Sequence, residues 1–425
     1  MRTNKILQLI VLMAALLPAA AYSLTPTAPT FPKILGMQIG GSGTKNYEVY
    51  SYQQQLAKYD AVILAFYKGW STKTYTMEGV VKSLKSMNPN ILVGQYTILS
   101  ESYDNNFSNA KIDIANELYA QNWWLLNAAG QKTQWSTVYN AYNSNYTNWT
   151  VPDNQGNRLP QWMAQRDYNV FFSQVPEFDI WYFDAVTYQP LIASADWKQI
   201  GTNQFNTDSD IQTAHRQGHA AEWAAARVLR PNVIQMVNNA NNDLSYPEYL
   251  KQVGGGFIEG LMGANGSLET WAGWVPMMQR YYNSLNNTIA PNIVGFGVLH
   301  DPANYVFFRY SYASCLMNNG YYSFSNLTLP DWYSQAVWFD EYDVKLGTAI
   351  DAPPVISNTL QPYKRHFQYG MAIVNPTTTT VSVPVEKGYS HFVGTQDPVT
   401  NNGAAVSGSI SMPPKSGIIL VKTNN

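Results

Sequence analysis

Eight short apolar runs alternate with helical stretches and longer connections between residues 34 and 324, and this alternation is the strongest constraint on the fold. Runs of this length without polar alternation are typical of strands buried on both faces of a parallel sheet. Strands that alternate with helices form right-handed βαβ units. The expected strands, in chain order, are 34–39, 60–66, 91–98, 178–184, 233–238, 256–259, 293–300 and 321–324. The helices expected between them include 110–126 and 268–285.

Eight such units within roughly 300 residues fit a closed (β/α)8 TIM barrel. The alternative arrangement is an open, doubly wound sheet, which often carries a dinucleotide site. No G-x-G-x-x-G motif follows the first expected strand, so nothing supports such a site. We therefore predict the α/β class, with a (β/α)8 barrel domain over residues 34–349.

The pattern changes after residue 349. Four β-like runs, 367–374, 380–385, 389–394 and 408–422, are separated by turn-forming pairs such as Asn375-Pro376 and Lys387-Gly388. Short β-like runs with frequent turns are typical of antiparallel sheets. We predict a small C-terminal antiparallel β-sandwich domain over residues 350–425.

The first residues have the features of a secretory signal peptide. A short basic start is followed by an apolar run over 6–17 and by small residues up to Ala21. The apolar run is too short to cross a bilayer, which takes about 20 residues, and no later stretch is long and apolar enough to do so. We expect residues 1–21 to be removed, 22–33 to form a linker rich in Pro and Thr, and the protein to be secreted or periplasmic.

Charge and cysteine content exclude several classes of function. Loss of Arg2 and Lys5 with the signal peptide moves the net charge from -2 to -4, which gives no electrostatic case for binding nucleic acid or an anionic membrane. Cys315 is the single cysteine, so an intrachain disulfide is impossible. The sequence has no Cys/His cluster for zinc and no EF-hand spacing, and we expect no metal or other cofactor.

Aromatic residues are abundant and charged residues are scarce. The chain has 14% aromatic residues, including 30 Tyr and 13 Trp, against 13% charged residues, about half the usual share. Sugars present apolar ring faces and hydroxyl edges, so flat aromatic side chains beside amides and carboxylates suit a carbohydrate partner. The same residues also suit the surface of a secreted protein, and composition leaves both interpretations open.

The fourth expected strand, in the segment FDIWYFDAV (178–186), carries two carboxylates. Burying an unpaired carboxylate costs several kcal/mol. Asp179 lies at the start of this strand, whereas Asp184 lies at its C-terminal end, where parallel α/β proteins bind their ligands. We therefore interpret Asp184 as a functional residue. The alternative is that it caps the following turn or pairs with a buried arginine.

Glu259 lies at the same position of the sixth expected strand. Two carboxylates that face one cavity can divide the work of glycosidic cleavage: one protonates the leaving oxygen, and the other attacks the anomeric carbon or activates water. An apolar pocket raises the pKa of the acid and keeps it protonated. The alternative for Glu259 is a salt bridge with Arg280 or Lys251.

Further candidates lie at or near the strand ends. Glu101 follows the third strand, either at the site or simply in a loop. Asp301 precedes Pro302 and an expected helix over 302–317, so it is also a good N-cap. His300 could bind substrate or be a packed neutral histidine, and the aromatic candidates could equally be core residues. The proposed substrate-binding set is Gln38, Tyr67, Tyr96, Tyr188, Asn238, Trp271, His300, Asp301 and Tyr322.

Several segments together resemble a known family. The segments YDAVILAF, FDIWYFDAV, GGFIEG, NNGYYSFS, WFDEYDVKLG and RHFQYGMAIVNP resemble glycoside-hydrolase-like family fifteen, over roughly residues 34–374. The chain is also similar, more distantly, to endo-polygalactosaminidase-like barrels and to the α-galactosidase clan.

The resemblance implies a secreted, glycosidase-like barrel with a C-terminal β-sandwich. In the α-galactosidase clan the catalytic carboxylates follow strands four and six. Asp184 and Glu259 match those positions, which implies that Asp184 is the nucleophile or base and Glu259 the acid/base. A group of acids after strand eight, Asp340, Glu341 and Asp343, could form a latch between the domains or part of the site rim.

Two functions fit these observations. The first is a secreted glycoside hydrolase that cleaves a polysaccharide with two carboxylates and no cofactor. The second is a non-catalytic glycan-binding or surface-assembly protein on the same barrel. A separation of about 5–10 Å between the two carboxyl groups would favour hydrolysis. A polysaccharide lyase is less favoured, because few Arg and Lys residues lie at the strand ends.

Overall fold

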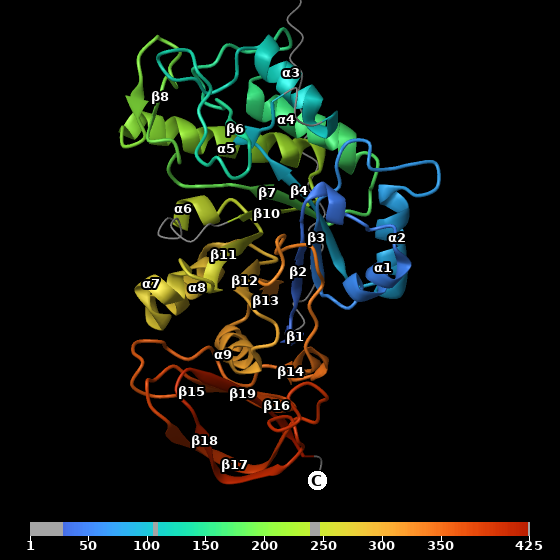
Figure 1. The fold of residues 1–425 in the computed structure, drawn as a ribbon, viewed down its shortest axis with the longest axis vertical. Coiled ribbons are helices and arrows are strands. Elements are labelled where there is room, and N and C mark those ends of the chain that lie inside the picture. Colours follow the sequence, from blue (N-terminus) through green and yellow to red (C-terminus); the bar gives the residue numbers. More distant parts are fainter. Residues whose placement is uncertain (1–28, 105–108, 239–246, 424–425) are drawn as a thin grey trace, which may run out of the picture.

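The computed structural model describes residues 29–104, 109–238 and 247–423. The expected signal peptide, 1–21, and the first part of the expected linker lie outside these ranges. Figure 1 shows a body of strands and helices above a smaller all-β part, with helix α9 (Tyr305–Leu316) between them. Within the described ranges, the search for an apolar helix of membrane-spanning length found none.

Eight parallel strands form one sheet in the order β13-β12-β11-β10-β7-β4-β3-β2, and its two ends meet. A parallel bridge joins Ile34 to Tyr322, and the Tyr322 N–H donates to the Lys33 carbonyl over 2.9 Å. This nearly closed sheet confirms a TIM-like barrel, and the open-sheet alternative does not hold. The strands are β2 (Leu35–Gln38), β3 (Ala61–Leu64), β4 (Leu92–Ile98), β7 (Ile180–Asp184), β10 (Ile234–Asn238), β11 (Gly255–Gly263), β12 (Ile293–His300) and β13 (Tyr321–Asn326).

Amphipathic helices cover the outside of the barrel. In α2, Val80, Val81 and Leu84 are buried on one face, and the Thr76 hydroxyl caps the start by accepting from the Gly79 N–H. The helices other than α9 are α1 (Tyr50–Leu56), α2 (Met77–Met87), α3 (Ile112–Ala120), α4 (Leu159–Asp167), α5 (Ser209–Leu229), α6 (Pro247–Leu250), α7 (Leu268–Ala272) and α8 (Trp274–Asn287).

Three helix predictions need correction. The helix expected over 268–285 is interrupted by Gly273, whose φ of 93° and ψ of 169° suit only glycine. The helix expected over 110–126 ends at Ala120. Helix α9 begins at Tyr305, where the Asn304 side chain accepts from the Phe307 N–H, so Asp301 is not its cap.

The long segment between β4 and β7 is an ordered insertion with its own buried cluster, which includes Trp123 and Trp124. One short antiparallel pair ties it to the end of β4: β5 (Glu101–Ser102) with β6 (Tyr142–Asn143). A second pair follows β7: β8 (Ser194–Ala195) with β9 (Gln204–Phe205). The remaining short turns are η1 (Ser42–Thr44), η2 (Asn109–Lys111), the π-helical η3 (Tyr168–Phe172) and η4 (Asp340–Asp343).

The C-terminal part is one five-stranded antiparallel sheet in the order β15-β16-β19-β17-β18, so the predicted sandwich is not confirmed. The register of β17 shifts between Val385 and Tyr389, and before the shift β17 pairs with β18 alone. Val383 and Val385 of β17 share a buried cluster with Ile373 of β16, so the sheet folds over its own core. The strands are β15 (Tyr363–Phe367), β16 (Gly370–Asn375), β17 (Val381–His391), β18 (Ala405–Met412) and β19 (Ser416–Lys422), and a separate pair joins β1 (Thr30–Phe31) to β14 (Gly347–Thr348).

This sheet packs against α9. At Gly417 of β19, a Cβ atom would lie 2.1 Å from the Arg309 carbonyl oxygen, so the two backbones are in close contact. The Arg309 guanidinium lies 3.5 Å from the Glu341 carboxylate and 2.5 Å from the Asp397 carboxylate. The Asp340 carboxylate accepts hydrogen bonds from two backbone N–H groups in the loop after β17. These bonds favour the interpretation of the acidic group after β13 as a latch.

Candidate active site

Asp184 and Glu259 lie at the C-terminal mouth of the barrel, on strands separated by β10. Asp184 is the last residue of β7, in register with Ile98 at the end of β4. Glu259 lies in a bulge of β11, where pairing with β12 is interrupted between Ile258 and Met262. A bulge bends a strand and turns side chains toward a new direction. Strand β11 therefore runs four residues beyond its predicted end at Glu259.

A single amide joins the two carboxylates. The Nδ2 atom of Asn238, the last residue of β10, donates to Asp184 Oδ1 over 2.7 Å and to Glu259 Oε2 over 2.8 Å. Because both bonds start at one nitrogen, these two oxygens lie at most about 5.5 Å apart, the limit set by the two bond lengths. The structure thus brings together three of the predicted site residues, and a fourth, Tyr96, donates to Asp184 Oδ2.

A tyrosine hydroxyl holds the outer oxygen of each carboxylate. Tyr96 of β4 donates to Asp184 Oδ2 over 2.5 Å, and Tyr333 donates to Glu259 Oε1 over 2.5 Å. Tyr333 lies in the loop after β13, between Asn326 and η4. Each carboxylate therefore accepts one phenol and one amide hydrogen bond, which fixes the direction of both groups.

The electrostatic environment of Glu259 differs from that of a glutamate on the protein surface. Burial raises its pKa first, and the nearby charge of Asp184 raises it further, while the bonds from Tyr333 and Asn238 lower it. The net shift is upward. A buried acid next to a second carboxylate is the arrangement that lets one of the pair keep its proton near neutral pH.

A cavity of about 170 Å³ opens beside Glu259 and Tyr333. Its lining includes Gly260, Gly266 and Gly297, which have no side chains to fill it, and the Trp332 indole is part of its wall. The volume equals that of several water molecules, at about 30 Å³ each in the liquid. Since Glu259 lines it, a group that occupies the cavity can exchange a proton with Glu259.

A third carboxylate, Glu101, lies on the other side of Asp184. It belongs to β5, three residues beyond Ile98, and Trp135 of the insertion donates its indole N–H to Glu101 Oε2 over 2.5 Å. Burial and the charge of Asp184 raise the pKa of Glu101, whereas the Trp135 bond and Lys111 lower it. The structure places Glu101 in a short strand near Asp184, which favours the site position over the simple loop position that the sequence left open.

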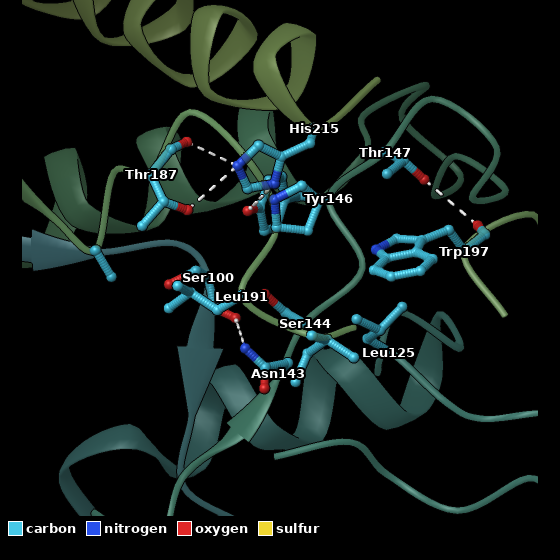
Figure 2. A pocket seen from close by; sticks show the side chains of 13 residues that line it. Ser100, Leu125, Asn143, Ser144, Tyr146, Thr147, Thr187, Leu191, Trp197 and His215 are labelled. Carbon is cyan, nitrogen blue, oxygen red and sulfur yellow. Dashed lines mark hydrogen bonds between the residues drawn. The ribbon is translucent and has the colours of Figure 1, made fainter. Parts of the chain in front are cut away.

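A buried histidine fixes the loop that follows Asp184. Ala185 has a left-handed φ of 52°, a conformation that costs energy for any residue except glycine. His215 of α5 holds this turn through Nε2, which lies 2.8 Å from the Thr187 carbonyl, while its Nδ1 lies 2.8 Å from the Tyr146 hydroxyl. Figure 2 shows these side chains around a cavity of about 30 Å³.

Two predicted substrate residues are core residues, and this corrects their assignment. Tyr322 is the second residue of β13, is 1% exposed and has its hydroxyl 2.6 Å from Ser311. Gln38 is buried at the end of β2, where its Oε1 accepts from the Tyr52 hydroxyl over 2.6 Å. Neither side chain has surface left for a ligand.

The remaining candidates are not part of the bridged group. Tyr67 packs on the core with Lys45 above its ring, and Tyr188 stacks under the Arg216 guanidinium at 4.3 Å. The other three lie on the β11 to α9 side of the mouth. His300 stacks on Phe307, Asp301 accepts from the Ala303 N–H in the turn before α9, and Trp271 of α7 is 62% exposed.

Asp179, the other carboxylate of the fourth strand, has a structural role. It forms a salt bridge of 2.7 Å with Lys85 and accepts the Val93 N–H over 2.8 Å. This pairing satisfies the charge of a partly buried carboxylate at the N-terminal end of β7.

Sequence reasoning missed Tyr333 and Trp135 as site residues. Both lie in loops that follow barrel strands, where active-site groups of this fold gather. The loop after β13 contains Trp332 and Tyr333, two adjacent aromatic residues, which is the signal that could have pointed to it. Within the insertion, no motif distinguishes Trp135 from the other aromatic residues.

Three solved structures with distant similarity are glycosidases or their domains. A variant of the GH36 α-galactosidase AgaA from Geobacillus stearothermophilus aligns with 93% of this chain at 12% identity and a TM-score of 0.47, and this chain spans 57% of its length. An α-amylase from Lactobacillus plantarum aligns at 9% identity and a TM-score of 0.49, covering 92% of this chain and 99% of its own. The glycoside hydrolase domain of PelA from Pseudomonas aeruginosa aligns at 12% identity and a TM-score of 0.41, covering 71% of this chain and 98% of its own.

Among curated protein sequences, comparison finds no match. A family model does match, over residues 85–371, which contain Asp184, Glu259 and all the groups that bind them. The match covers more than half of the 425 residues. The chain therefore belongs to hypothetical glycosyl hydrolase family 15.

Proposed function

We propose that the protein is a glycoside hydrolase that cleaves a polysaccharide, with Asp184 and Glu259 as its catalytic pair. The observation that carries the proposal is the bridge from Asn238 Nδ2 to both carboxylates, over 2.7 and 2.8 Å. This bridge directs both groups to one point at the barrel mouth, where the chemistry of this fold takes place.

The roles follow from the surroundings of each group. Glu259 has a raised pKa and lines the 170 Å³ cavity, so it is suited to hold a proton and to give it to the glycosidic oxygen of the leaving group. Each carboxylate accepts two hydrogen bonds, so this feature does not distinguish them, and the acid role of Glu259 leaves attack on the anomeric carbon to Asp184. Asp184 is therefore assigned as the nucleophile.

We infer retention of the anomeric configuration, because the two carboxylate oxygens that share the Asn238 amide lie at most about 5.5 Å apart. Retaining enzymes hold their carboxyl groups about 5–5.5 Å apart, and inverting enzymes hold them about 6.5–9.5 Å apart. In the first step Asp184 forms a bond to the anomeric carbon while the bond from that carbon to the leaving oxygen breaks. The leaving oxygen takes the proton of Glu259. In the second step water replaces Asp184 and returns a proton to Glu259.

The test is reducing-sugar release from a panel of polysaccharides by the wild type, Asp184→Asn and Glu259→Gln. Each substitution removes the charge or the proton with little change in shape, so we expect each variant to lose at least about 10³-fold in activity. Ser409→Ala, at an exposed position of β18 in the C-terminal sheet, is the control. Full activity in either variant would remove that residue from the mechanism, and release with inverted product configuration would refute the assigned step.

A glycan-binding protein without catalysis is the second candidate from the sequence. It is identified in the same experiment by retention on a polysaccharide without sugar release, in the wild type and in both variants. Export is a separate proposal that rests on residues 1–21, and N-terminal sequencing of the mature protein tests it. A mature chain that still begins at Met1 would refute export by this signal.

A further inference from the structure

Two aromatic side chains at the tip of the insertion remain exposed. Trp135 is 42% exposed and Tyr139 is 52% exposed, and their ring centroids lie 5.6 Å apart. In the described part of the insertion, the buried cluster around Trp123 and Trp124 contains neither ring. Their apolar faces are therefore not used for packing of the insertion core, and an exposed aromatic pair marks a candidate binding surface.

Hydrogen bonds fix Trp135 in place. Its indole N–H donates to Glu101 Oε2 over 2.5 Å, and its backbone N–H donates to Asn143 Oδ1 over 3.1 Å. Glu101 and Asn143 are themselves partners in the β5–β6 pair. The ring is thus attached to the end of β4, the strand that pairs with β7 at Asp184.

The position of Tyr139 supports a location over the mouth of the barrel. Burial raises the pKa of its hydroxyl, and the charges of Glu259, Glu101 and Asp184 raise it further. These carboxylates come from three different strands. Because the charges of all three carboxylates affect the Tyr139 hydroxyl, it lies on the side of the insertion that faces the catalytic pair.

We propose that Trp135 and Tyr139 form a stacking subsite that holds one sugar unit of the substrate beside the carboxylate pair. This inference rests on the proposed glycoside hydrolase function and assigns part of its substrate surface. Aromatic rings bind the apolar face of a pyranose, while the free lone pairs of Glu101 can accept hydroxyl hydrogens at its edge. The subsite lies on the Asp184 side, opposite to the cavity beside Glu259.

Binding is tested apart from catalysis in the Asp184→Asn, Glu259→Gln protein. Its mobility is measured in native gels that contain soluble starch, galactomannan, arabinogalactan or mixed-linkage β-glucan. Trp135→Ala and Tyr139→Ala are added singly, and we expect each to weaken retardation by about tenfold. Trp135→Phe and Tyr139→Phe keep a ring and should retain most of the retardation. Tyr50→Ala, at an exposed tyrosine of α1, is the matched control.

The outcomes separate the two proposals. Loss of retardation in the alanine variants, with retention in the phenylalanine variants, supports the subsite even if the wild type releases no sugar. Unchanged retardation in both alanine variants overturns the subsite even if the wild type is an active hydrolase. Absence of retardation of the parent protein in every polymer also overturns it. Melting temperatures of all variants confirm that each protein is folded.

Discussion

The hydroxyl of Tyr333 controls the acid of the proposed pair. Its bond to Glu259 Oε1 is one of two that lower the pKa of that carboxyl group against burial and the charge of Asp184. Two adjacent aromatic residues mark its loop in the sequence, but only the folded loop after β13 brings the hydroxyl to Glu259 of β11. The direction in which its removal changes the pH dependence of activity nevertheless follows from this hydrogen bond.

We expect Tyr333→Phe to raise the pKa of Glu259, since a donor to the ionised form is lost. A proton donor with a higher pKa stays protonated to a higher pH. The alkaline limb of the profile of kcat/KM against pH should therefore move to higher pH. The measurement is kcat/KM against pH on any polysaccharide that the wild type cleaves, with Tyr50→Phe as the control for loss of a hydroxyl. An alkaline limb that stays in place or moves to lower pH would contradict the role of this bond.

His215 makes a second prediction at the residue scale. Burial lowers its pKa to about 4, against about 6.5 in an unfolded chain. Between these values the unfolded chain binds more protons, so its contribution to stability is complete above pH 6.5 and is lost as the pH falls toward 4. The loss is on the order of 3 kcal/mol at most. The ring faces Tyr146, Thr187, Arg216 and His219; the Thr187 carbonyl raises the pKa of His215 in part, and the charge of Arg216 lowers it further.

Denaturant unfolding between pH 4.5 and 7.5 measures this effect. The wild type should lose stability steadily below pH 6.5, whereas His215→Gln should be less stable at pH 7.5 but show a flatter profile. His366→Gln, a change in the C-terminal sheet, should keep the steep decline. An equally steep decline in His215→Gln would show that other groups cause it.

Single residues also show where sequence reasoning ends. Asp184, Glu259 and Asn238 could be found because each lies at the end of an apolar run of the sequence, where a polar group needs a partner or a function. The assignment of Tyr322 to the substrate site was wrong because this residue lies near the start of β13, and the site lies at the other end of that strand. Gln38 has the expected position but a core partner, Tyr52, which only the packing of α1 supplies.

At the scale of elements, the strands were predictable and their irregularities were not. All eight barrel strands follow from apolar runs, because burial on both faces leaves little choice of residue. The bulge in β11 and the break between α7 and α8 depend on glycines at positive φ, Gly260 and Gly273. A glycine inside an apolar pattern is compatible with either a continuous element or a break, so its conformation decides the case.

We expect Gly273→Ala to destabilise the protein by about 1–3 kcal/mol, because the backbone conformation at this position suits only glycine. Gly43→Ala, where a Cβ atom would meet no atom within 4 Å, is the matched control and should change stability little. Thermal unfolding of both variants is the measurement. Equal melting temperatures would contradict the account of the break between α7 and α8.

At the scale of the whole molecule, the C-terminal sheet and the barrel share α9. The sequence indicated an all-β part after residue 349, but it could not distinguish two sheets from one folded sheet, because both bury alternate residues. Docking depends on Gly417, where the sheet backbone contacts Arg309. A side chain at this position must push the sheet away from the helix.

We expect Gly417→Ala to cost about 1–3 kcal/mol through this overlap. Ser409→Ala, at an exposed position of β18 in the same sheet, should have little effect. Differential scanning calorimetry measures both. If the C-terminal sheet is an essential cover of α9, Gly417→Ala lowers the temperature of the main unfolding transition. A change limited to a minor early transition would show that the barrel is stable without the sheet.

The bridge between Ile34 and Tyr322 has a consequence for the order of events during folding. The residues that close the barrel are about 290 positions apart, and the β1–β14 pair joins segments that are farther apart still. Contacts at such separation form late, because the chain between them must first be ordered. During synthesis, the first strand has no partner on one edge until the eighth leaves the ribosome. For most of that time the growing protein is an open sheet with two exposed edges, which is the state that chaperones bind and that aggregates when they do not.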